Sequence, residues 1–138
     1  MSYAYYPGCS LEKNASAYHD STTVVAEKLG IELEEIDDWN CCGATEYISI
    51  DLIPAYALVA RNLAIAAKQA NNGSPRELVA PCSACFLNLS KTDRYMADSE
   101  GLATQVNKAL KAGGLHYEPH SVRVHHFLDV IVNDVGLD

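Results

Sequence analysis

Residues 78–85 read Leu-Val-Ala-Pro-Cys-Ser-Ala-Cys, and this short stretch decides the fold class. Its three apolar residues predict a short buried strand, and a helix is expected to follow over residues 84–96. A strand that passes almost directly into a helix is typical of an α/β domain with a parallel sheet. Cys82 therefore lies just after a strand, at the edge of a parallel sheet where ligand sites gather.

The rest of the chain shows the same alternation of strands and helices. Residues 31–36 alternate apolar and acidic side chains, which predicts a half-buried strand. In total we expect four strands, at residues 3–6, 31–36, 78–80 and 121–125. We also expect five helices. They cover residues 15–29, Pro54 to about 71–73, 84–96, 102–112 and 127–132. We therefore expect an α/β fold, with a mostly parallel sheet flanked by helices.

The cysteines are the unusual feature of the composition. There are five of them, Cys9, Cys41, Cys42, Cys82 and Cys85. Cys9, the adjacent pair and Cys82 each fall just after a predicted strand. Because the carboxyl ends of parallel strands lie along one edge of the sheet, we expect the thiols to cluster there. His125 follows the fourth predicted strand and is a further candidate for that edge.

Length, charge and hydropathy restrict the class of protein. With 138 residues the chain fits one domain, and its formal net charge of −8 makes nucleic acids and anionic lipids poor partners. The apolar stretch over residues 48–70 is interrupted by charged residues, so no membrane span is expected. The amino terminus does not resemble a signal peptide. We therefore expect a cytoplasmic protein, in which structural disulfides are rare.

Thiolates favour zinc, copper(I) and iron–sulfur clusters. Zinc takes four ligands in a tetrahedron, and two neighbouring residues such as Cys41 and Cys42 rarely point at one such ion. An adjacent pair suits ligands that reach different metal atoms of a cluster. Gly43, and Gly8 before Cys9, would then remove side chains from a crowded backbone. The CxxC at residues 82–85 equally suits zinc or a redox dithiol.

Several blander interpretations stay open. Buried free cysteines also act as small apolar residues, and His125–His126 is more often a packed pair than a source of metal nitrogens. Tyr6 is expected to pack beside the first strand, and Trp39 to cover the cysteines with apolar surface. A non-catalytic module is a further alternative, in which the cysteines hold a structural zinc or an electron-relay cluster for a partner dehydrogenase.

Four motifs carry a resemblance to a known family. They are Tyr5-Tyr6-Pro7-Gly8-Cys9-Ser10, Asp38-Trp39-Asn40-Cys41-Cys42-Gly43-Ala44, Arg61-Asn62-Leu63-Ala64 and Pro81-Cys82-Ser83-Ala84-Cys85. With these motifs the chain resembles the cysteine-rich CCG domain family over essentially its whole length. By its motif pattern it resembles the B subunit of heterodisulfide reductase most.

The resemblance implies an iron–sulfur function. In that family each CCG motif binds a non-cubane [4Fe-4S] cluster, so one cluster would be held by Cys9, Cys41, Cys42, Cys82 and Cys85. The implied chemistry is the reduction of a small-molecule disulfide to thiols. The implied partner is an iron–sulfur electron-transfer subunit of a reductase complex.

The number of motifs departs from the family. Its full-length B subunits carry two CCG motifs, whereas residues 1–138 contain one. We therefore expect a single cysteine-rich domain that corresponds to the N-terminal half of a longer subunit, either as a fragment or as a split subunit. Complete disulfide-reducing activity is not expected of this part alone.

Overall fold

A four-stranded parallel sheet forms the centre of the computed structural model, which describes residues 2–8, 16–40 and 52–136. The strands are β1 (Ser2–Tyr5), β2 (Glu32–Glu35), β3 (Glu77–Ala80) and β4 (Arg123–His126). Their order is β2-β1-β3-β4, and each neighbouring pair is parallel. The α/β class and the parallel sheet that the sequence predicts are thus confirmed.

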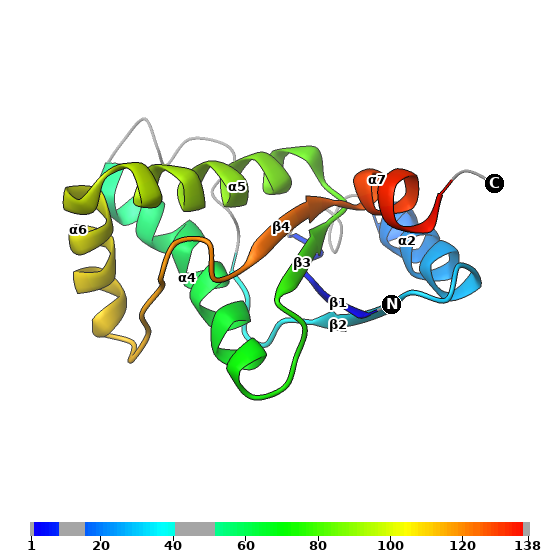
Figure 1. Cartoon of the computed structure of the whole chain (residues 1–138), viewed down its shortest axis with the longest axis horizontal. Helices are drawn as coiled ribbons and strands as arrows, with labels where there is room; N and C mark the ends of the chain where they lie inside the picture. Colours follow the sequence, from blue (N-terminus) through cyan, green and yellow to red (C-terminus); the bar gives the residue numbers. More distant parts are fainter. Residues whose placement is uncertain (1, 9–15, 41–51, 137–138) are drawn as a thin grey trace.

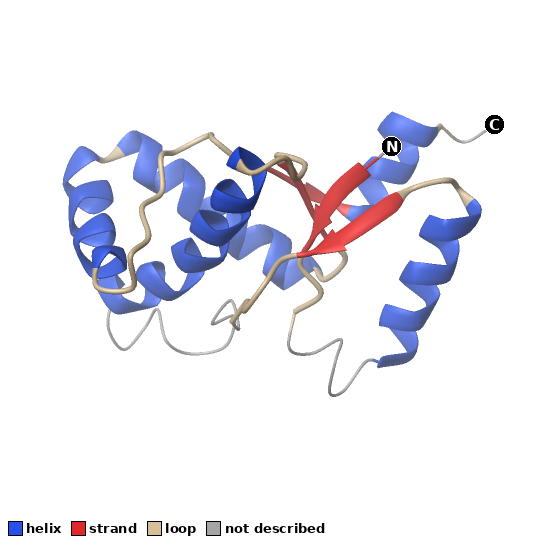
Figure 2. Cartoon of the chain, turned by 90° about the horizontal axis from the view of Figure 1, so that it is seen from below, coloured by secondary structure: helices blue, strands red, loops and turns tan. Residues whose placement is uncertain are grey.

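Helices cover both faces of this sheet (Figures 1 and 2). The larger group lies on one side and consists of α4 (Leu52–Asn71), α5 (Ser83–Asp98) and α6 (Glu100–Lys111). The smaller group lies on the other side and consists of α2 (Ser16–Lys28), α7 (Phe127–Asp129) and the π-helical η1 (Val130–Val135). None of the described helices is long and apolar enough to cross a bilayer.

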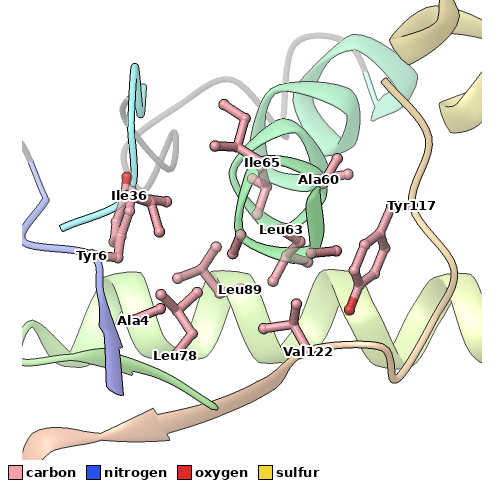
Figure 3. Packing of buried hydrophobic residues seen from close by; sticks show 14 of the residues in the cluster. Ala4, Tyr6, Ile36, Ala60, Leu63, Ile65, Leu78, Leu89, Tyr117 and Val122 are labelled. Atoms are coloured by element: carbon pink, nitrogen blue, oxygen red, sulfur yellow. The ribbon is translucent and has the colours of Figure 1, made fainter. Parts of the chain in front are cut away.

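The main core lies between the sheet and the larger helix group (Figure 3). Leu78 of β3, Leu63 of α4 and Leu89 of α5 meet there, and all three are fully buried. Alternate strand residues point the other way, so that Tyr3 and Val79 form a smaller core with α2, α7 and η1. Burial of β1 and β3 on both faces is typical of the central strands of a parallel sheet.

Most expected elements differ from the observed ones by one or two residues at an end, and in two of them the physical reason is clear. The strand predicted at 121–125 begins only at Arg123, because both the backbone N–H and the hydroxyl of Ser121 donate to the carbonyl of Glu118 in a turn. The helix predicted at 127–132 is α-helical only over α7 and continues as η1. In both places a local hydrogen-bonding pattern decides the boundary.

A buried carboxylate fastens the segment between α6 and β4. Asp93 of α5 accepts hydrogen bonds from the hydroxyl of Tyr117, from the backbone N–H of His120 (2.8 Å) and from the imidazole Nδ1 of His120 (2.8 Å). Tyr117 is fully buried, and Asp93 is nearly so. Since a buried carboxylate needs partners, these three donors fix the loop on α5.

Replacing Tyr117 by phenylalanine tests this attachment. Burial, followed by the bond to Asp93, raises the pKa of Tyr117 above its ordinary value of 10. The folded chain therefore keeps this proton where the unfolded chain releases it, so the contribution to stability is complete below pH 10 and falls as the pH rises above 10. We expect Tyr117→Phe to lower the free energy of unfolding at pH 7 by about 1–2 kcal/mol.

The same variant is expected to flatten the loss of stability above pH 10. Urea unfolding at pH 7, 10 and 11 measures both effects, and Tyr95→Phe serves as the control at an exposed tyrosine. An unchanged slope above pH 10 in Tyr117→Phe would contradict the prediction.

Candidate functional site

The CxxC occupies the junction between β3 and α5. Cys82 is the N-cap residue of α5, with extended backbone angles, and its carbonyl accepts the N–H of Phe86 (2.9 Å). Cys82 is half-buried and Cys85 is buried. Both thiols therefore lie at the carboxyl edge of the sheet, where the sequence places them. Cys9, Cys41 and Cys42 lie outside the described residues.

Gly8, which precedes Cys9, packs directly against the CxxC. Its φ angle is +84°, and a Cβ atom at this position would lie 2.8 Å from Sγ of Cys85. No side chain fits there without displacing the sulfur. The expectation that Gly8 removes a side chain from a crowded backbone is confirmed, while Gly43 lies outside the described residues. The segment that leads to Cys9 is thus in contact with Cys85.

Asn40, which precedes Cys41, is held by two buried side chains. Asn62 of α4 accepts the backbone N–H of Asn40 at Oδ1 (2.9 Å) and donates from Nδ2 to its carbonyl (2.9 Å). The hydroxyl of Tyr6 donates to the same carbonyl (2.6 Å). Asn62 and Tyr6 are both 0% exposed. The backbone before the adjacent cysteines is therefore fixed to the end of β1 and to α4.

The side chain of Asn40 is also fixed. Its Oδ1 accepts from Nη1 of Arg61 (3.0 Å), and its Nδ2 donates to the carbonyl of Leu58 (2.8 Å). Arg61 also donates to the carbonyl of Asp38 (2.6 Å) and pairs with its carboxylate (2.6 Å). Because the Asp38 carboxylate is exposed, the ion pair adds little stability. The hydrogen bonds to the backbone carbonyls of Asp38 and Leu58 are therefore the contacts that position this segment.

Three motifs that the sequence shows separately thus form one hydrogen-bonded cluster. Tyr6 comes from the first motif, Asn40 from the second, and Arg61 with Asn62 from the third. Sequence reasoning expected Tyr6 only to pack beside the first strand, and it gave Asn40, Arg61 and Asn62 no structural role. The available signal was Asn62 itself, an amide within the buried face of an apolar helix, because a buried amide requires hydrogen-bond partners.

Trp39 lies beside this cluster. Its ring meets the ring of Tyr6 edge to face, with 5.4 Å between centroids, and its Nε1 donates to the carboxylate of Glu35 (3.0 Å). The half-buried indole packs against the main core. The expectation that Tyr6 packs beside the first strand is confirmed. The expectation that Trp39 covers the cysteines with apolar surface stays a prediction.

The two neighbouring histidines have different surroundings. His126 lies beside the CxxC, with Nε2 3.1 Å from Oγ of Ser83 and its ring edge to face with Phe86. His125 lies near Glu77 (3.3 Å), with its ring edge to face with Tyr3. Alternation along β4 explains the difference. The structure therefore places His126 beside the cysteines, rather than His125.

Of the five candidate cysteine ligands, the structure describes Cys82 and Cys85. Among residues 2–8, 16–40 and 52–136, no three His, Cys, Asp or Glu side chains are arranged to hold a metal ion. The five-cysteine ligand set stays a prediction. The described residues contribute two thiols at the sheet edge, a glycine against one of them, and a hydrogen-bonded anchor before the adjacent pair.

Comparisons with known proteins add to this geometry. A family model described as "CCG: Cysteine-rich domain" matches residues 3–90. The chain is similar to the 8-methylmenaquinol:fumarate reductase membrane anchor subunit of Wolinella succinogenes, with 34% identity over 116 residues, which cover 84% of this chain and 38% of the relative. It is also similar to a protein of Archaeoglobus profundus named as like the B subunit of heterodisulfide reductase, with 27% identity over 139 residues, which cover 100% and 44%.

A solved structure shares the fold. A hypothetical protein from Helicobacter pylori superposes with a TM-score of 0.77 at 19% identity, and the match covers 94% of this chain and 25% of that one. At this identity the likeness supports the fold alone. The chain spans less than half the length of the two curated relatives.

Proposed function

The chain belongs to the cysteine-rich CCG domain family, and from this premise we propose that it is an iron–sulfur redox domain of the type found in the B subunit of heterodisulfide reductase. The proposed cofactor is a non-cubane [4Fe-4S] cluster. Its proposed ligands are Cys9, Cys41, Cys42, Cys82 and Cys85. When bound, the cluster would supply single electrons for the conversion of a disulfide to two thiols, which consumes two electrons and two protons.

One observation carries the proposal most directly. Gly8 has no Cβ atom, and this leaves room for the sulfur of Cys85. A Cβ at this position would lie 2.8 Å from that sulfur. This contact joins the segment before Cys9 to the CxxC, although the sequence separates them by more than 70 residues. Soft thiolates gathered at a sheet edge fit the ligand chemistry of an iron–sulfur cluster.

The surrounding residues supply support rather than ligands in this proposal. Asn62 and Tyr6 hold the backbone of Asn40 and so set the direction in which the chain enters Cys41. Trp39 and Tyr6 place aromatic surface beside that entry. Outer contacts of this kind orient ligands, and the apolar surface limits access of water.

The relatives suggest the wider setting. Both curated relatives are, by name, subunits of reductases or similar to one. We propose that an iron–sulfur partner subunit supplies electrons to this domain and that the substrate is a small-molecule disulfide. The alternative is a non-catalytic module, because the CxxC after β3 suits a structural zinc or an electron-relay cluster equally well.

Metal analysis of serine variants tests the proposal. After anaerobic reconstitution of the full chain, we expect about four irons per chain, and each of the five Cys→Ser variants is expected to lower the iron content. A serine hydroxyl is a harder and less acidic ligand than a thiol. Iron, zinc and sulfide per chain are the quantities to measure, with the visible spectrum and the thermal midpoint.

The outcomes separate the candidates. Colourless protein with one zinc, and one cysteine of the five dispensable, would favour the structural zinc site, because a tetrahedron needs four ligands. Two cysteine variants that keep full iron and an unchanged spectrum would end the five-ligand proposal.

A further inference from the structure

A polar cavity of about 590 Å³ lies against β4. Ser90 and Asp93 of α5, His120 of the turn before β4, and residues 122–125 line it. The volume is typical of sites for small ligands. None of the lining residues belongs to the cysteine motifs, so a ligand here would occupy a second site.

The backbone of β4 offers a hydrogen-bond donor to this cavity. β4 is the last strand in the sheet order, and no other described strand pairs with its outer edge. The N–H of Arg123 donates to the carbonyl of Arg76 (3.0 Å) and so points to the β3 side. Alternate residues of a parallel strand direct their N–H groups to opposite edges. The N–H of Val124, which lines the cavity, therefore points to the outer edge.

Asp93 determines which nitrogen of His120 carries the ring proton. A carboxylate can only accept, so Nδ1 of His120 donates to it (2.8 Å), and the neutral ring leaves Nε2 without a proton. The backbone N–H of His120 and the hydroxyl of Tyr117 hold the same carboxylate. Within the described ranges no residue is hydrogen-bonded to Nε2, and the side chain is 70% exposed. Nε2 is therefore an oriented acceptor that a ligand can reach.

The attachment to Asp93 does not by itself require an imidazole. The φ angle of His120 is +68°, a left-handed conformation in which asparagine is among the best tolerated residues other than glycine. An asparagine amide could also donate to Asp93. The imidazole adds a second nitrogen, and that nitrogen is the acceptor at the cavity.

Arg123 adds a positive charge. Its guanidinium is exposed and lies 3.7 Å from the carboxylate of Glu77, a weak pair that Glu77 shares with His125 (3.3 Å). The fork of five N–H donors leaves Arg123 able to bind an oxyanion. Asp93 is the one carboxylate among the described lining residues, and three donors already compensate its charge.

We propose that this cavity binds a phosphate group that retains a proton, either as the free ion or in a small monoester. Nε2 of His120 accepts the phosphate hydroxyl, while Arg123 and the N–H of Val124 donate to the charged oxygens. Hydrogen phosphate carries both a hydroxyl and anionic oxygens near neutral pH, whereas sulfate has acceptors only. A site with a fixed acceptor rejects a ligand that lacks the matching donor, so the cavity selects phosphate over sulfate.

NMR titrations of the metal-free full chain test the proposal, in reducing buffer at pH 7 and constant ionic strength. Inorganic phosphate is expected to shift the Val124 amide and the His120 ring resonances saturably, with about tenfold higher affinity than sulfate. Methyl phosphate distinguishes the two sources of the group. An affinity at least equal to that of inorganic phosphate assigns the site to esters, and a lower affinity assigns it to the free ion.

Two variants separate the roles of the side chains. His120→Asn keeps a donor to Asp93 and removes Nε2, so phosphate should bind about tenfold more weakly and lose its advantage over sulfate. Arg123→Gln should weaken both ions by roughly three- to tenfold. Arg94→Gln is the matched control, because Arg94 is as exposed as Arg123 (78% for both side chains) but does not line the cavity. It should bind both ions like the wild type.

Several results would overturn the inference. Phosphate that leaves the Val124 and His120 resonances unshifted, or that binds no more tightly than sulfate, would do so. Equal losses in Arg94→Gln and Arg123→Gln would show a general attraction to surface charge instead. If His120 only anchors the turn, His120→Asn will keep the wild-type preference for phosphate. The thermal midpoint of each variant shows whether lost binding follows lost folding.

Discussion

Replacing Gly8 by valine is expected to lower the free energy of unfolding of the metal-free chain by about 3 kcal/mol. Two costs add. A residue with a Cβ disfavours a φ of +84°, by roughly 1–2 kcal/mol, and the Cβ would lie 2.8 Å from the Cys85 sulfur, which is overpacking of roughly 1–3 kcal/mol. The sulfur must move, so iron uptake should fall as well. Urea unfolding and iron per chain measure the two effects.

Gly114→Val is the matched control for this prediction. Gly114 has a φ of +72°, close to that of Gly8, but a Cβ at Gly114 would meet nothing within 4 Å. We expect it to show the conformational cost alone and to leave iron uptake near that of the wild type. Equal losses of stability and iron in the two variants would show that the contact with Cys85 is unimportant.

Replacing Asn62 by leucine is the second change with a large expected effect. Leucine has a similar volume, but it leaves the half-buried N–H of Asn40 without the Oδ1 acceptor, while the carbonyl keeps only the hydroxyl of Tyr6 as a donor. An unsatisfied donor costs about 1–3 kcal/mol and the second lost hydrogen bond about 1 kcal/mol, so we expect a loss of about 2–4 kcal/mol in the free energy of unfolding. Because Asn40 precedes Cys41, iron uptake should fall too.

Asn107 of α6 offers an unusually close control. Its Oδ1 accepts the backbone N–H of Tyr117 (2.8 Å), and its Nδ2 donates to the Tyr117 carbonyl (3.0 Å), which is the arrangement that Asn62 makes with Asn40. Asn107→Leu should lower stability to a similar extent and leave iron uptake unchanged. If both variants lose iron in proportion to stability, Asn62 has no specific role at the cysteines.

The class of the fold follows from short-range patterns. Residues 78–80 form a buried strand, and α5, whose N-cap and first turn contain the CxxC, begins three residues later. Because β1 and β3 are buried on both faces, successive residues of each strand must be apolar, and such continuous apolar runs can be seen in the sequence. Gly30 follows α2 with a φ of +74°, a backbone conformation that suits a glycine at the C-terminal end of a helix.

The contacts that unite distant segments could not be predicted in this way. Asn62 and Asn40 are 22 residues apart, and Asp93 and His120 are 27 apart. Such pairs depend on how whole helices pack, and neither pair has a characteristic spacing. The order of the strands is set by the same long-range packing. At the site, the sequence located the CxxC and the crowding at Gly8, but it singled out His125 as the histidine for that edge, where the structure has His126 beside the CxxC.

The central position of β1 has a consequence for synthesis on the ribosome. β1 pairs with β2 on one side and with β3 on the other. Ala80 is translated 45 residues after Glu35, which takes about 2–9 s at roughly 5–20 residues per second. During this interval β1 has one of its two partners, and in the proposed ligand set three thiols have been made before the remaining two. The proposed cluster site is therefore incomplete on the nascent chain until the third strand and the CxxC that follows it have emerged.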